Sequence, residues 1–137
     1  MDSVKMVLEY LRECEVFYMA TEDGTAPRVR PMSGVCAAEG KLCFLLSRSS
    51  HLYHEIMVNR RVEISALHPD KSWISIRGWL KEEVERETRD RMLKACQDDI
   101  EDMGLVDEKD MAVCSLQGGS VYLRDRNAGR EKEIALG

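Results

Sequence analysis

The sequence lacks the features that mark membrane proteins, nucleic-acid-binding proteins and secreted proteins. Its longest apolar runs have five residues, as in Leu42–Leu46, whereas a membrane span needs about 20. No block of lysine and arginine exceeds two or three residues and the net charge is −5, so we expect neither nucleic acid nor an anionic membrane as a partner. The first residues, Met1-Asp2-Ser3, carry no basic patch and no apolar stretch typical of a secretory signal. These absences predict a cytoplasmic protein.

Cysteine occurs without the spacing of a metal site or of a disulfide framework. The cysteines never form a CxxC motif, and their number, five, is odd. The histidines also lack metal-ligand spacing with suitable carboxylates, so we expect no metal site. We interpret the cysteines as small apolar residues in a reducing compartment. They are Cys14, Cys36, Cys43, Cys96 and Cys114.

Common catalytic and nucleotide-binding motifs are missing as well. The sequence has no GxxxxGK[ST] phosphate loop, no GxGxxG after a strand, and no Ser-His-Asp or Cys-His arrangement. These absences do not exclude an enzyme, because a cofactor can carry chemistry while the protein mainly binds and orients it.

The length and composition fit one folded domain that spans residues 1–137. A chain of 137 residues lies in the usual range for a single domain, and a hydrophobic fraction of 44% is enough for a core without metals or disulfides. Charged residues make up 33% and are mixed in sign, which is typical of a folded chain. The segment 125–137 is polar, and we expect a loose tail there.

Hydrophobic patterning predicts many short strands and a few helices. Apolar residues repeat at helical spacing over residues 4–14, around Leu52 and Ile56, and over residues 83–103. The expected strands are Val16–Thr21, Arg28–Gly34, Lys41–Leu46, Val62–Leu67, Ser72–Glu82, Met111–Leu116 and Ser120–Arg124, the last two joined in a hairpin by Gln117-Gly118-Gly119. The pattern indicates a mainly β fold with inserted helices, an antiparallel and nearly closed barrel of six or seven strands with about three helices.

Two segments carry residues suited to a phosphate group. Arg28 and Arg30 lie two apart in an extended segment, so their side chains share a face and repel each other unless an anion lies opposite. The alternative is a solvated face on which glutamates pair with them. The run Ser47-Arg48-Ser49-Ser50-His51 leads into the short helix, whose free N–H groups favour an anion, although an ordinary helix cap is the alternative. Together the segments predict a phosphate-bearing ligand.

The order and spacing of these segments resemble the pyridoxamine 5′-phosphate oxidase-like family, the FMN-binding split β-barrels. The resemblance covers roughly residues 14–82 and runs through Val16–Thr21, Asp23-Gly24, Pro27–Met32, Gly40–Phe44, Asn59, Val62–Ala66 and Trp73–Gly78. It implies a homodimer with two FMN molecules at the subunit interface. The residues that it implies at FMN are Arg28, Arg30, Pro31 and Met32 along the flavin, Ser47, Ser49, Ser50 and His51 around the phosphate, and Trp73 near the edge of the isoalloxazine ring.

The resemblance implies an FMN-dependent oxidoreductase that transfers hydride or electrons to a small organic substrate, with a nicotinamide as a candidate donor. The family usually has lysine or arginine where this chain has Ser50-His51, and histidine is only partly charged near pH 7, which implies weaker phosphate binding. The alternative is a non-catalytic protein that binds flavin or another phosphate-bearing ligand for storage or sensing. A third hypothesis, haem binding, depends on His51, His54 and His68.

Overall fold

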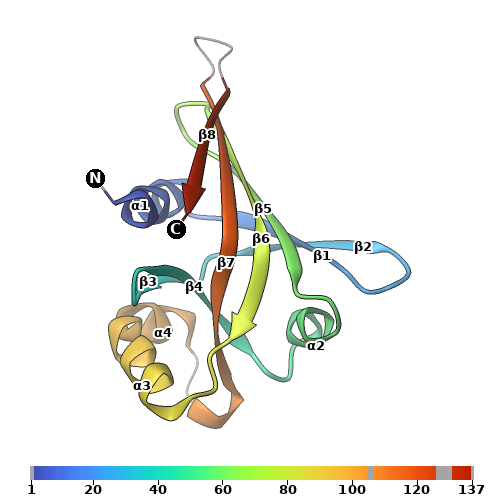
Figure 1. The fold of residues 1–137 in the computed structure, drawn as a ribbon, viewed down its shortest axis with the longest axis vertical. Helices are drawn as coiled ribbons and strands as arrows, with labels where there is room; N and C mark the ends of the chain where they lie inside the picture. The colour runs from blue at the N-terminus through green and yellow to red at the C-terminus, as the bar shows by residue number, and fades with distance from the viewer. Residues whose placement is uncertain (1, 105–106, 126–130, 137) are drawn as a thin grey trace.

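The computed structural model describes residues 2–104, 107–125 and 131–136, which form an eight-stranded antiparallel sheet and four α-helices (Figure 1). The helices are α1 (Ser3–Cys14), α2 (His51–Val58), α3 (Arg86–Ala95) and α4 (Gln97–Met103), and a short 3-10 helix covers Glu108–Asp110. The strands are β1 (Phe17–Glu22), β2 (Pro27–Met32), β3 (Val35–Ala38), β4 (Lys41–Ser47), β5 (Arg61–Leu67), β6 (Trp73–Glu82), β7 (Met111–Arg124) and β8 (Glu131–Leu136). The predicted class, mainly β with inserted helices, is confirmed.

The sheet has the strand order β2-β1-β5-β6-β7-β4-β3, with β8 added to β7. Because β2 and β3 end this order, the barrel is split between them. The strands exceed the predicted six or seven because two were not recognised. The four-residue β3 has no alternating burial that would mark it, and β8 lies in the segment 125–137 that was expected to be loose. Of that segment, residues 126–130 and 137 lie outside the described residues.

Strand β7 is continuous where the sequence predicts a hairpin. Its first half pairs with β4, its second half pairs with β8, and β6 runs along its other edge. Gly118 and Gly119 form a bulge opposite Gly78, and Gly118 has the left-handed backbone angle (φ 58°) that glycine adopts without strain. The hairpin predicted at Gln117-Gly118-Gly119 is therefore wrong, since a glycine pair permits a bulge as well as a turn.

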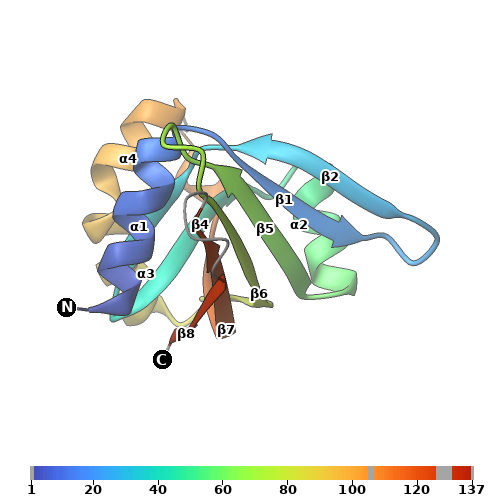
Figure 2. The same cartoon turned by 90° about the horizontal axis from the view of Figure 1, so that it is seen from above.

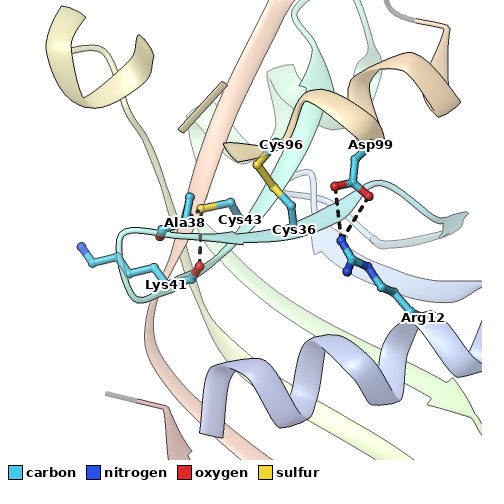
Figure 3. Close-up of a disulfide and its surroundings, with 7 residues drawn as sticks. All are labelled: Arg12, Cys36, Ala38, Lys41, Cys43, Cys96 and Asp99. Carbon is cyan, nitrogen blue, oxygen red and sulfur yellow. Dashed lines mark hydrogen bonds and ion pairs between the residues drawn. A yellow bond between two sulfur atoms is a disulfide. The ribbon is translucent and has the colours of Figure 1, made fainter. Parts of the chain in front are cut away.

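The single helix predicted over 83–103 is instead two helices that meet at Cys96. Helix α3 begins after Glu85, whose carboxylate accepts hydrogen bonds from two backbone N–H groups of the first turn. At Cys96 the backbone leaves the helical conformation, and the side chain forms a disulfide with Cys36 of β3, with 5.7 Å between the Cα atoms (Figure 3). The expectation of unpaired cysteines is wrong for this pair, because residues 60 apart meet only in the fold. Free thiols remain at Cys14, Cys43 and Cys114.

The main core lies between the sheet and its helices. Figure 2 shows α1 along one side of the barrel and α2 beneath the β1–β2 hairpin. Phe17 and Phe44 meet edge to face in this core, with ring centroids 5.7 Å apart. Within the described part of the chain, no helix is long and apolar enough to cross a membrane. The predicted apolar stripe of α1 is confirmed, since its buried residues are Val4, Val7, Leu8 and Leu11.

The outward-pointing side chains of β1, β2, β5 and β6 form an exposed surface that we call the outer face. Alternating burial along β5 shows that every second residue points outward. The strand register puts Leu67 beside Trp73 and Tyr18 beside Pro31 on this face. Leu67 is 61% exposed and Tyr18 is 49% exposed, so the outer face presents large apolar side chains to its surroundings.

Candidate ligand site

Residues 47–50, which we call the serine turn, surround a carboxylate at the start of α2. The turn connects β4 to α2, and Ser50 caps the helix by accepting a hydrogen bond from a first-turn N–H. Asp110, just before β7, accepts hydrogen bonds from the Ser49 N–H (3.1 Å), the Ser47 hydroxyl (2.5 Å) and the Ser49 hydroxyl (3.5 Å). The serine turn therefore binds an anionic group through one backbone donor and two hydroxyl donors.

Arg48 of the serine turn is held by a second carboxylate. Its guanidinium donates to Glu82 (Nη2–Oε2 2.8 Å) and to the Lys109 carbonyl (3.0 Å). The Tyr53 hydroxyl donates to the other oxygen of Glu82 (2.6 Å). The hydrogen bond to Glu82 is the main cause that raises the pKa of Tyr53 and the pKa of Arg48. The Glu82 side chain is only 10% exposed. A charge with so little access to water needs a partner of opposite sign, and Arg48 supplies it.

Arg30 extends from β2 to α2. Its Nη2 lies 2.6 Å from Glu55 Oε2, and its Nη1 donates to the Thr21 hydroxyl (3.1 Å). The Thr21 hydroxyl donates in turn to Glu55 (3.3 Å), whose side chain is 14% exposed. The structure thus brings Arg30 and the serine turn to the same short helix. The anion that faces Arg30 in the structure is the Glu55 carboxylate.

Arg28 is the second residue of β2, beside the β1–β2 turn. Its Nε lies 2.8 Å from Asp23 Oδ2, and the side chain is more than half exposed. Hydrogen bonds from Thr25 and Ala26, together with that from Arg28, hold the pKa of Asp23 well below its usual range. Arg28 is therefore an exposed arginine paired with a nearby acid, which is the alternative that the sequence analysis gives for the two arginines.

The other predicted β-strand residues lie on two sides of the sheet. The register with β1 puts Arg30 and Met32 on the inner side, where α2 lies, and Pro31 on the outer face. Trp73, at the start of β6, also lies on the outer face. Within one chain, the residues predicted along the flavin therefore do not line one pocket.

The three histidines are in two separate places. His51 and His54 are exposed on α2, whereas His68 follows β5 and places its Nε2 3.0 Å from Glu13 of α1. The described residues contain no group of three histidine, cysteine, aspartate or glutamate side chains that could hold a metal ion. The histidines offer no shared ligand site within one chain.

Sequence reasoning missed the three carboxylates that organise the site, Glu55, Glu82 and Asp110. Glu82 lies 34 residues from its partner Arg48, and Asp110 lies 61 to 63 residues from its partners in the serine turn. Local spacing cannot indicate partners at such separations. Glu55 had one available signal, since it lies on the helix that follows the serine turn.

A groove of about 530 Å³ opens on the outer face beside Trp79. The Trp79 ring lies against Gly118, where an added Cβ would come within 2.5 Å of ring atoms. Arg61 lies opposite Trp79 in the β5–β6 register. Thr21, which accepts a hydrogen bond from Arg30, also lines this groove. The groove was not predicted, because its walls come from β1, β5, β6 and β7.

Comparison with known proteins identifies the family. No family model matches the chain, and no curated protein matches it. Among solved structures, a NimC/NimA family protein from Clostridium acetobutylicum is 32% identical, with a TM-score of 0.85, over 97% of this chain and 92% of that protein. The chain belongs to the NimC/NimA family. At this identity and coverage, the relationship extends beyond the segments 14–82 that carry the resemblance.

More distant structures share the fold of this NimC/NimA family member. One is a protein of the pyridoxine phosphate oxidase family, related to general stress protein 26, from Clostridium acetobutylicum (12% identity, TM-score 0.68, 97% of this chain and 94% of that one). Another is a heme binding protein from Mycobacterium smegmatis (16% identity, TM-score 0.70, 93% of this chain and 57% of that one). The resemblance to pyridoxamine 5′-phosphate oxidase-like split barrels is confirmed.

Proposed function

We propose that this protein binds FMN through its phosphate at the serine turn and acts as a flavin-dependent oxidoreductase on a small organic substrate. The observation that carries the proposal is the donor set of the serine turn, which already binds the Asp110 carboxylate. A donor set of hydroxyl and N–H groups at a helix start fits a phosphate as well as a carboxylate. The resemblance to the FMN-binding split β-barrels supports the choice of a flavin, and one structural neighbour is named as a FAD-binding protein.

The residues of this chain would bind and orient the cofactor. Ser47 and Ser49 would hold the phosphate through their hydroxyl groups, and the first-turn N–H groups of α2 would add the positive end of the helix dipole. Arg30, fixed by Thr21 and Glu55, supplies a guanidinium beside the same helix. Bound FMN supplies the redox chemistry by accepting and returning a hydride. His51, exposed at the first residue of α2, contributes positive charge only in its protonated form.

We further propose that the outer face binds a second copy of this chain. The face exposes large apolar side chains that a monomer would leave in water, and it carries Pro31 and Trp73. In a symmetric dimer through this face, Pro31 and Trp73 would lie at the subunit interface. Sedimentation should give a dimer, and replacement of Leu67 by aspartate should dissociate it. A monomeric wild-type protein at working concentration would overturn this assembly.

The cofactor proposal is tested by the absorbance spectrum of the purified protein before and after addition of FMN and removal of the excess. We expect bound-flavin bands in the wild type and in Ser3→Ala, a matched control on α1. We expect them to be lost or strongly reduced in the double variant Ser47→Ala/Ser49→Ala. A wild-type protein that stays colourless after both steps would refute flavin binding.

A non-catalytic flavin-binding protein is the second candidate. It is motivated by His51, which lies where the family usually has a basic residue. The pairing of Arg30 with Glu55 and of Arg48 with Glu82 leaves less positive charge for a phosphate in either candidate. Anaerobic mixing of the flavin-loaded protein with NADH or NADPH separates the two candidates. Bleaching of the flavin bands supports the oxidoreductase, whereas flavin that stays oxidised with both donors supports the binding protein.

A further inference from the structure

The helical segment α3–α4 is attached to the barrel by a small apolar contact, by one covalent bond and by the ion pairs Arg91–Glu39 and Arg12–Asp99. Met92 is the only side chain of α3 that is buried in the described structure, and it packs in a small cluster with Cys36, Leu45 and Val113. The disulfide between Cys36 and Cys96 lies in the same cluster, and both cysteines are at most 1% exposed. Figure 3 shows this bond joining β3 to the junction of α3 and α4.

Helix α3 also holds the segment that carries Asp110. The Arg89 guanidinium donates through Nη2 to the carbonyls of Glu108 (2.8 Å) and Met111 (2.9 Å). These carbonyls lie on either side of Asp110, which binds the serine turn. On the side of the serine turn, the backbone N–H of Arg48 donates to the Asp110 carbonyl (2.6 Å). Segment 108–111 is therefore hydrogen-bonded to α3 on one side and to the serine turn on the other.

We propose that the Cys36–Cys96 pair is a redox latch that controls the ligand affinity of the serine turn. In the oxidised state the disulfide fixes α3, Arg89 fixes segment 108–111, and Asp110 occupies the donors of the serine turn. In the reduced state α3–α4 loses its covalent attachment and keeps its small apolar contact, the Arg91–Glu39 and Arg12–Asp99 ion pairs and the Arg89 hydrogen bonds. Because these contacts open more easily than a covalent bond, Asp110 leaves more readily and an external phosphate binds more tightly. The effect on affinity rests on the proposed phosphate site at the serine turn.

The redox step is an exchange with a small-molecule thiol or disulfide. Reduction by a dithiol breaks the Cys36–Cys96 bond, leaves both cysteines as thiols and converts the dithiol to its cyclic disulfide, so two electrons and two protons pass to the protein. A small-molecule disulfide reverses the step and is released as two thiols. Because both sulfurs are buried, the exchange requires a local opening of α3–α4.

Cys43 does not serve as an alternative partner in this exchange. It lies opposite Cys36 in the β3–β4 register, and its thiol donates to the backbone carbonyls of Ala38 and Lys41. Burial raises the pKa of Cys43 to about 11, so the reactive thiolate is scarce at neutral pH. Cys43→Ser is therefore a matched control that removes a thiol from the same cluster without touching the latch.

The test compares oxidised protein with protein reduced by dithiothreitol, using FMN and inorganic phosphate as probes. We expect reduction to tighten binding by about fivefold or more in the wild type and in Cys43→Ser. Cys36→Ser and Cys96→Ser should bind like reduced wild type whether or not reductant is present. In Asp110→Asn, reduction should leave affinity unchanged, because the latch acts through the Asp110 carboxylate.

Hydrogen exchange of the peptide that covers residues 107–111 gives a readout that needs no ligand. Exchange there should accelerate on reduction in the wild type and in Cys43→Ser. Equal affinity and equal exchange in the two redox states would overturn the latch. If neither state binds FMN or phosphate, the proposed function fails, while faster exchange on reduction still supports the latch.

Discussion

Replacement of Gly78 by alanine tests the packing of β6 against the β7 bulge. A Cβ at this position would lie 2.7 Å from the Gln117 carbonyl oxygen and 2.9 Å from Cδ1 of Leu116. Ordinary contacts of carbon with a carbonyl oxygen are about 3.3–3.6 Å, so β7 would have to move by more than half an ångström. The obstacle is backbone in the middle of a paired strand, which cannot rotate away as a side chain can.

The expected cost follows from these contacts. Overpacking in a well-packed region typically costs about 1–3 kcal/mol, and a backbone obstacle puts Gly78→Ala in the upper half of that range. Alanine also lowers the conformational entropy of the unfolded chain, which stabilises the folded protein by about 0.5 kcal/mol. The expected net decrease in the free energy of unfolding is therefore about 2 kcal/mol. For 137 residues the entropy of unfolding is about 0.29 kcal/mol/K, so the loss lowers Tm by about 7 °C.

The assay is urea unfolding of wild type, Gly78→Ala and Gly118→Ala, followed by circular dichroism and tryptophan fluorescence. Gly118→Ala provides the comparison, because its Cβ would meet the ring of Trp79, which is 48% exposed and can move. Its cost should therefore come mainly from the left-handed backbone angle at Gly118, about 1–2 kcal/mol for a residue with a Cβ. We expect a changed native fluorescence in Gly118→Ala and little change in Gly78→Ala. A Gly78→Ala protein as stable as wild type, within about 0.5 kcal/mol, would refute the argument from backbone contact.

Two further predictions concern buried charge and buried thiols. Glu55→Gln should cost about 1–2 kcal/mol in urea unfolding, because it removes the charge that faces the largely buried Arg30, whereas Glu63→Gln, in an exposed pair, should cost less than about 0.5 kcal/mol. Equal costs would contradict this difference. Burial raises the pKa of Cys43 to about 11 and the pKa of Cys114 to about 12, so between pH 9 and these values the unfolded chain binds fewer protons than the folded one. The urea midpoint should therefore fall as pH rises through this range, and replacement of both thiols by alanine should flatten the fall. An unchanged slope in that variant would count against buried, protonated thiols.

Local patterns in the sequence predicted most strands and the helix α1, because burial alternates along β5 and repeats at helical spacing along α1. The glycine pair at the β7 bulge was misinterpreted, since its conformation depends on pairing with β6. For the site, the sequence indicated Arg30 and the serine turn. It could not indicate Asp110 as the anion that the turn binds, because this contact forms only when segments more than 60 residues apart meet.

The long β7 strand has a consequence for the route by which the chain folds. β7 joins the β3–β4 hairpin to the ladder of β2, β1, β5 and β6, so these two parts remain separate sheets until β7 pairs with both. During synthesis from the N-terminus, the barrel cannot form before residues 111–124 have left the ribosome. Until then β4 and β6 each present an unpaired edge, and such edges promote association between chains. Folding dominated by these distant pairings should be slow for a domain of this size.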